Sequence, residues 1–289
     1  MQTANKTINE FEIYSKKLNK ELLDLAIPAN PDTKTRAKIT SILKSTNDSM
    51  TKIGFDFLDQ QPFLGNEAKR LFCKKTDVLV TTVFDLVHKK FFPSTSPSKG
   101  HSFSLVAVGG YGRGEMAPYS DIDLLFLSPY HQTDWAKNIV ESVLYILWDL
   151  KFKVGHSSRT IADCVQLGLD DLTIRTSMLE KRYLCGSRGL FKELETTLSR
   201  KVFSKKASNF VEGKLSERTE RHLKHANARY MLEPNIKEGK GGLRDLHTLY
   251  WISKYIYKTD NIHSLIEKKI FKKRELEIFT EAENFLWFI

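Results

Sequence analysis

The sequence predicts an α+β protein, in which a small mixed β-sheet is flanked by helices and an all-α region follows. Two short β-capable runs, "FSLVAVGG" (103–110) and "DIDLLFL" (121–127), lie close together in the chain. A third run, "KFKVGHSSRTI" (151–161), comes after an amphipathic segment, and segments with helical periodicity surround all three. This order of elements indicates a small sheet covered by helices.

The helices before and within the sheet region are predicted from the spacing of apolar residues. Apolar residues recur every three or four positions over 34–58 and 66–92, which predicts two amphipathic helices, and Pro93 ends the second. The segment 93–100 is a loop because it is rich in Pro, Ser and Gly. Between the second and third strands, 136–150 places its apolar residues on one helical face.

The rest of the chain is expected to be mainly helical. The segments 171–186 and 189–203 are predicted helices, and the chain beyond Phe203 continues as helix except at a second glycine cluster, "NIKEGKGGLRD" (235–245, the second glycine loop). The last residues, 275–289, stop in the middle of a helical pattern, so we expect the chain to end before its last domain does. The predicted division is an N-terminal helical region (1–62), a sheet domain (63–200) and a helical domain (201–289).

Composition favours a globular, cytoplasmic protein. A hydrophobic content of 41% over 289 residues excludes global disorder, and neither a signal peptide nor a membrane span is expected. The three cysteines form no CxxC pair, which favours reduced thiols. A net charge of +10 suits a polyanion, a nucleotide or an acidic protein partner. Because the basic residues are scattered, we expect no dedicated nucleic-acid surface.

Two acids head the second predicted strand. Side chains alternate between the faces of a strand, so Asp121 and Asp123 point the same way while Ile122 and Leu124 face the core. Two neighbouring carboxylates remain ionised at low cost only beside a cation. Mg²⁺ suits this site because it takes oxygen ligands and is usually completed by substrate phosphates.

The glycines before these acids are the second half of the motif. Gly109, Gly110 and Gly112, in the first glycine loop (109–114), allow the backbone to approach a phosphate closely. Ser120 adds a hydroxyl and Arg113 adds positive charge for the same phosphate. A strand, a Gly-Gly pair, nine residues and Ser-Asp-x-Asp on a second strand together predict a site for a metal-bound nucleoside triphosphate.

These residues resemble the DNA polymerase β-like nucleotidyltransferase superfamily, whose GG…(S)DxD signature matches Gly109, Gly110, Ser120, Asp121 and Asp123. From about residue 69 onward the chain is similar to the N-terminal portion of the bifunctional protein-PII uridylyltransferase/uridylyl-removing enzymes. The similar segments are "VAVGGYGRGEMAPYSDIDLLFL", "ESVLYILWDLKFKVGHSSRT", "DLTIRTSMLEKRYLCG" and "EPNIKEGKGGLRDLHTLYWI".

The resemblance implies transfer of UMP from UTP to a tyrosine of the PII nitrogen-signalling protein, with release of pyrophosphate. It implies that Asp121 and Asp123 hold Mg²⁺ and that Gly109 and Gly110 contact the phosphates. It also favours a substrate-facing role for Lys237 and Arg244 beside the second glycine loop, since a helix N-terminus with nearby cations attracts anions. Arg159, at the end of the third strand, either contacts a phosphate or forms a surface ion pair.

Two departures from the family pattern remain. The third strand offers no third acid, so Glu180 or Asp171 is a candidate third metal ligand, unless two acids suffice. The chain also contains no His-Asp dipeptide, so we expect neither the HD hydrolase domain nor the paired ACT domains of the longer enzymes. The alternatives are a protein adenylyltransferase of the type that modifies glutamine synthetase, a nucleotide- or PII-binding fragment without turnover and, third, a nucleic-acid polymerase-like role.

Overall fold

The structure is a computed structural model of the 289-residue chain. It describes residues 2–25, 27–29, 31–61, 63–93, 102–130, 133–225, 233–259 and 264–289. The predicted loop 93–100, apart from Pro93, lies outside the described residues. Within these ranges no helix is both long enough and apolar enough to cross a membrane.

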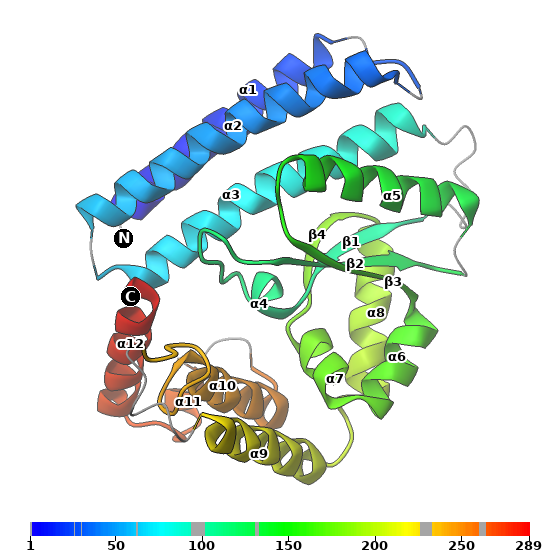
Figure 1. Ribbon diagram of the computed structural model, residues 1–289. Coiled ribbons are helices and arrows are strands. Elements are labelled where there is room, and N and C mark those ends of the chain that lie inside the picture. The colour runs from blue at the N-terminus through cyan, green and yellow to red at the C-terminus, as the bar shows by residue number, and fades with distance from the viewer. Residues whose placement is uncertain are drawn as a thin grey trace.

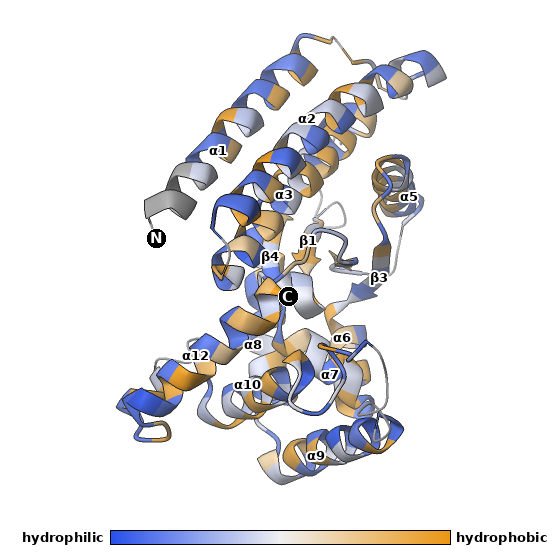
Figure 2. Ribbon diagram, turned by 60° about the vertical axis from the view of Figure 1, so that its left-hand side comes forward, coloured by the Kyte–Doolittle hydropathy of each residue, from blue (hydrophilic) through white to orange (hydrophobic). Residues whose placement is uncertain are grey.

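Three long helices form the N-terminal end of the molecule. The helices α1 (Gln2–Leu23), α2 (Thr33–Gln60) and α3 (Gly65–Leu86) lie side by side, as Figures 1 and 2 show. Asp32 begins α2, because its carboxylate accepts a hydrogen bond from the Thr35 backbone N–H at 2.8 Å. α3 continues as the π-helix η1 (Val87–Phe91). Together these bounds confirm the predicted helices 34–58 and 66–92.

A four-stranded sheet lies next to this bundle (Figure 1). Its strands β1 (Ser104–Ala107), β2 (Ile122–Ser128), β3 (Val154–Thr160) and β4 (Arg182–Gly186) have the order β3-β2-β1-β4. Strand β1 is antiparallel to β2 and β4, whereas β2 and β3 are parallel and are joined through α5 (Asp134–Asp149). The predicted mixed sheet is therefore confirmed.

The fourth strand corrects the prediction of a single helix over 171–186. The structure has α7 (Leu172–Leu179) and then β4, which pairs with β1 at the edge of the sheet. In β4, Tyr183 packs against one core and Leu184 against the other, which is the two-residue alternation of a strand. A run of five residues is too short for its periodicity alone to distinguish strand from helix. A further helix, α6 (Ile161–Asp170), precedes α7 and was not predicted.

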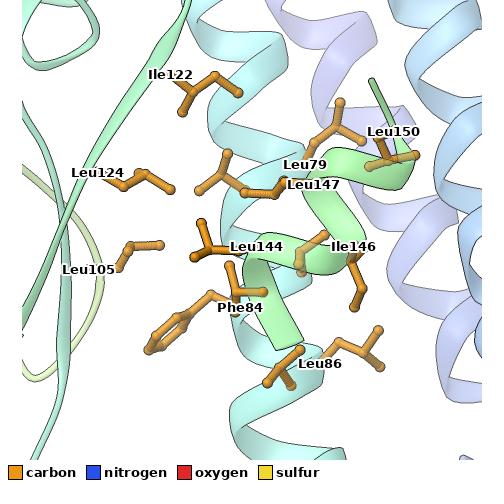
Figure 3. Close-up of a cluster of buried hydrophobic side chains, with 14 of the residues drawn as sticks. Leu79, Phe84, Leu86, Leu105, Ile122, Leu124, Leu144, Ile146, Leu147 and Leu150 are labelled. Atoms are coloured by element: carbon orange, nitrogen blue, oxygen red, sulfur yellow. The ribbon is translucent and has the colours of Figure 1, made fainter. Parts of the chain in front are cut away.

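Each face of the sheet carries its own apolar core. On one face, Leu105, Ile122 and Leu124 pack against α3 and α5, as Figure 3 shows. On the other face, Leu125 and Leu127 pack against α8 (Arg188–Lys201) and the helices after it. Each fully buried Leu or Ile side chain contributes roughly 1.5–3 kcal/mol relative to exposure. The strands are thus fixed from both sides, and β2 is held in one register.

The described chain after residue 200 is mainly helical apart from the second glycine loop and short connections, as predicted. Its helices are α9 (Ala207–Lys224), α10 (Leu243–Tyr257), the short α11 (Ser264–Glu267) and α12 (Lys273–Phe288). α9 and α10 contribute Phe210, Trp251 and Tyr255 to the second core, while α12 packs against α3 (Figure 1). Because the cores run continuously through all three predicted regions, the division at residues 62 and 200 remains a prediction.

Candidate active site

One cavity of about 1210 Å³ gathers almost all of the predicted site residues. Its walls come from the first glycine loop, β2, β3, α7, α9, the second glycine loop and α10, and Trp287 of α12 also lines it. The predicted residues that line it are Gly109, Gly110, Arg113, Ser120, Asp121, Asp123, Arg159, Glu180, Lys237 and Arg244. The fold therefore brings segments that are more than one hundred residues apart to one place.

The acid pair lies where β2 begins. Asp121 directly precedes the strand, and Ile122 and Leu124 are buried in the first core, as the alternation predicts. Burial raises the pKa of Asp123, and the negative charge of Asp121 raises it further, whereas Lys237 lowers it. The two carboxylates are therefore close enough to repel each other, and a cation between them would relieve this repulsion.

The carboxylate of Asp123 lies between two glycines. Gly109 has a φ of +60°, and a Cβ added there would lie 2.9 Å from Asp123 Oδ2. A Cβ added at Gly155 in β3 would lie 2.5 Å from Asp123 Oδ1. Only residues without a side chain leave room for this carboxylate. Gly155 was not predicted as a site residue, although a glycine inside a strand is itself a signal of close approach.

Ser120 adds a hydroxyl next to the acids. Its Oγ accepts a hydrogen bond from the Ala117 backbone N–H at 2.9 Å, which fixes the side chain. The hydroxyl hydrogen remains able to donate to an oxygen in the cavity. This position agrees with the predicted phosphate contact, which remains a prediction.

Arg113 has a different environment from the predicted one. Its side chain is only 7% exposed and lies between two carboxylates, those of Glu115 (Nε to Oε2, 2.7 Å) and Glu180. Trp251 also donates its indole N–H to Glu180. Since two carboxylates already hold the guanidinium, its position argues against the predicted phosphate contact and makes Arg113 an anchor of the first glycine loop.

The same ion pairs bear on Glu180 as a third metal ligand, which stays a prediction. The carboxylate of Glu180 is engaged by Arg113 and Trp251, while Asp171 caps α7 by accepting the Ile174 backbone N–H at 2.7 Å. Across the described parts of the chain, no three His, Cys, Asp or Glu side chains form a metal-binding group. Gly112 does not line the cavity either, because it packs against the backbone carbonyl of Glu180.

Glu115 connects the first glycine loop to two helices. Its carboxylate accepts from Lys69 Nζ in α3 at 2.9 Å and lies 3.3 Å from His247 Nε2 in α10. Burial opposes its ionisation, but Arg113, His247 and Lys69 hold the pKa of Glu115 well below its usual range. Burial and the charge of Arg113 lower the pKa of His247 to about 4. Sequence reasoning missed these partners because no local pattern links them.

The second glycine loop also lines the cavity. Lys237 is exposed, lines the cavity and is close enough to Asp123 to lower its pKa. Arg244 lines the cavity too, but it pairs with Glu238 at 3.1 Å. Arg159 lines the cavity from β3, and within the described residues no ion pair of its side chain is found. Lys237 and Arg159 are thus the predicted cations that remain available to a phosphate.

The donor set fits Mg²⁺. Two carboxylates, one of them with a raised pKa, stand in a roomy cavity that also holds cations. Mg²⁺ is commonly bound through one or two carboxylates, with waters and substrate phosphates as its other ligands. Asp121 and Asp123 would hold the ion, and a third protein ligand is not required.

Two family models of known proteins match the parts of the chain that form this site. The nucleotidyltransferase domain family model matches residues 87–184, which include the first glycine loop and the acid pair. The family model for GlnD PII-uridylyltransferase matches residues 209–289, which include the second glycine loop. The chain therefore contains a nucleotidyltransferase domain followed by a helical segment of the PII-uridylyltransferase type.

Three curated relatives carry the same description, bifunctional uridylyltransferase/uridylyl-removing enzyme. The protein of Ruegeria pomeroyi is 44% identical over 92% of this chain and 29% of its own length. The protein of Azospirillum brasilense is 43% identical over 99% of this chain and 30% of its own length. The protein of Cereibacter sphaeroides is 49% identical over 73% of this chain and 23% of its own length. The chain thus spans under a third of the relatives it matches. On these matches, the chain belongs to the family of bifunctional uridylyltransferase/uridylyl-removing enzymes.

Proposed function

We propose that the protein transfers UMP from UTP to a tyrosine hydroxyl of a PII signalling protein and releases pyrophosphate. The observation that carries the proposal is the acid pair, with Asp123 seated between Gly109 and Gly155 in a cavity that also contains Lys237 and Arg159. The names of the relatives support the uridylyl group, and the description of the matching family model supports PII as the acceptor. The proposed substrates place the reaction in the cytoplasm.

In the proposed reaction the tyrosine oxygen attacks the α-phosphorus and loses its proton to solvent. The bond from that phosphorus to the bridging oxygen breaks, and pyrophosphate leaves. Mg²⁺, when bound, neutralises charge on the phosphates and helps to align them. The chain itself contributes the two carboxylates, the Ser120 hydroxyl as a donor and the cations Lys237 and Arg159, all of which line the cavity. Catalysis then consists largely of positioning and charge stabilisation.

The test is a labelling assay with PII, Mg²⁺ and each of the four ribonucleoside triphosphates. We expect label on PII from UTP only, with stoichiometric pyrophosphate. The double variant Asp121→Asn, Asp123→Asn should lower the rate by at least about a thousandfold, because a metal contributes several kcal/mol to such a transfer.

Two outcomes would contradict the proposal. Preferential labelling from ATP would indicate a protein adenylyltransferase, and UTP binding without pyrophosphate release would indicate a binding fragment. An acceptor variant of PII with its modified tyrosine changed to phenylalanine is the control that shows which hydroxyl is used.

A further inference from the structure

Outside the acid pair, Lys69 of α3 is a buried cation that does not line the cavity. Its side chain is 6% exposed, and its ammonium group lies 2.9 Å from Glu115 Oε1 and 2.9 Å from Glu283 Oε1. It also lies 5.2 Å from the centre of the Trp287 ring. One lysine of α3 therefore joins the segment after the first glycine loop to the last described helix, α12.

On the loop side, both the backbone and the side chain of this segment are held. The Glu115 N–H donates to the Gly110 carbonyl at 3.0 Å, while the Met116 N–H donates to the Lys69 carbonyl at 3.4 Å. The Glu115 side chain also holds Arg113. A shift of Glu115 would therefore move Gly110, which belongs to the glycine pair predicted to contact the phosphates.

On the helix side, α12 is seated closely on the beginning of α3. A Cβ added to Gly65 would lie 2.6 Å from both the Asn284 carbonyl oxygen and Trp287 Cβ. The Asn284 side chain accepts a hydrogen bond from the Asn66 backbone N–H at 3.0 Å. Contacts this close leave α12 little freedom to shift without displacing Glu283 from Lys69.

We infer that α12 is coupled to the first glycine loop through Lys69, so that Lys69 and Glu283 are positioning residues for the bound triphosphate. The inference rests on the proposed function, because it concerns the same nucleotide site. The coupling follows contiguous contacts: Glu283 holds Lys69, Lys69 holds Glu115, and Glu115 holds Arg113 and Gly110. Neither Lys69 nor Glu283 lines the cavity, so they act only through other residues.

The test compares two glutamates of the same helix in the 289-residue chain. Glu283→Gln removes one of the two carboxylates at Lys69, whereas Glu281→Gln changes an exposed residue and serves as the matched control. With UTP and Mg²⁺ as the probe, calorimetry should show a Kd raised roughly 2- to 30-fold for Glu283→Gln. The control variant should keep the Kd of the unmodified chain.

A second variant tests the seating of α12 without changing any charge. It displaces Trp287, which lines the cavity itself, as well as Glu283, so Glu283→Gln is the variant that isolates the path through Lys69. Gly65→Ala should push α12 away from α3 and weaken UTP binding in the same range. Thermal melting of each variant separates the effects, since a merely structural role would lower the Tm and leave the Kd unchanged. An unchanged Kd in both variants would overturn the inference alone. No UTP binding by the unmodified chain would overturn the proposed function and, with it, this inference.

Discussion

The two glycine loops line the same cavity but are held in different ways. In the first, Arg113 and Glu115 are 7% and 13% exposed, and the structure ties them to α3, α10 and the end of α7. In the second, the pair Arg244 and Glu238 is 28% and 29% exposed. Asp245, at the end of that loop, is held by Arg221 of α9 in a pair whose side chains are 13% and 15% exposed. Removing one partner of a buried pair leaves an uncompensated charge, whereas a partly exposed pair contributes less. The first loop is therefore held at Arg113 and at Glu115 beside it, whereas the second is held at Asp245 and keeps Lys237 exposed to supply charge.

Among the buried anchors of the first loop, His247 should make the stability of the fold sensitive to acid. His247 has an ordinary pKa of 6.5 and a pKa of about 4 in the folded chain. Between these values the unfolded chain binds a proton that the folded chain does not, so stability falls as the pH falls from 6.5 to 4. The loss is on the order of 3 kcal/mol over that window.

Urea unfolding at pH 7 and pH 4.5 measures this effect. His247→Gln should remove most of the pH dependence, because glutamine does not titrate. His222→Gln, beside Asp245 at the second loop, is the comparison and should leave most of the dependence in place. Equal pH dependence in the unmodified chain and in His247→Gln would break the proposed contrast between the loops.

The next largest difference is expected between the transfer rates of two alanine variants, one at a glycine of each loop. Gly109 and Gly241 both have positive φ, +60° and +81°, so alanine is strained at either position. A Cβ added at Gly109 would approach Asp123. A Cβ added at Gly241 would have no atom within 4 Å. We expect Gly109→Ala to lower the transfer rate by about 100-fold, the effect of losing one preorganised group.

Gly241→Ala should cost about 1–2 kcal/mol of stability from backbone strain and leave the rate nearly unchanged. Rates at saturating UTP, measured beside melting curves, distinguish the two effects. If both variants lost the same fraction of activity, the close approach of Asp123 would not explain the need for glycine at position 109.

The smallest expected effect belongs to the second loop. Lys237 lines the cavity near Asp123, whereas Lys240 in the same loop does not line it. Lys237→Ala should raise the KM for UTP about tenfold, as expected for a lost charge-assisted hydrogen bond, with kcat little changed. Lys240→Ala is the matched control. A fall in kcat with KM unchanged would mean that Lys237 acts at the reacting phosphorus and not on the outer phosphates.

Much of the site could be predicted because its pattern is local. The strand alternation that separates Asp123 from Ile122 and Leu124 is fixed by backbone geometry over a few residues, and the buried Ile122 and Leu124 bear it out. The glycine pair before the acids is local too. The prediction of helix over β4 is wrong because pairing with β1, which is far away in the chain, makes this segment a strand. Its own five residues do not determine this.

The sequence by itself determined the α+β class, the acid pair and the glycine loop beside it, since each depends on the spacing of near neighbours. Only the tertiary structure decided the partners of the charged side chains. Arg113 meets Glu180 across 67 residues, and Lys69 meets Glu283 across 214. Many carboxylates in the sequence could satisfy either cation, and the packing of the helices and the sheet selects one only after the whole chain has folded.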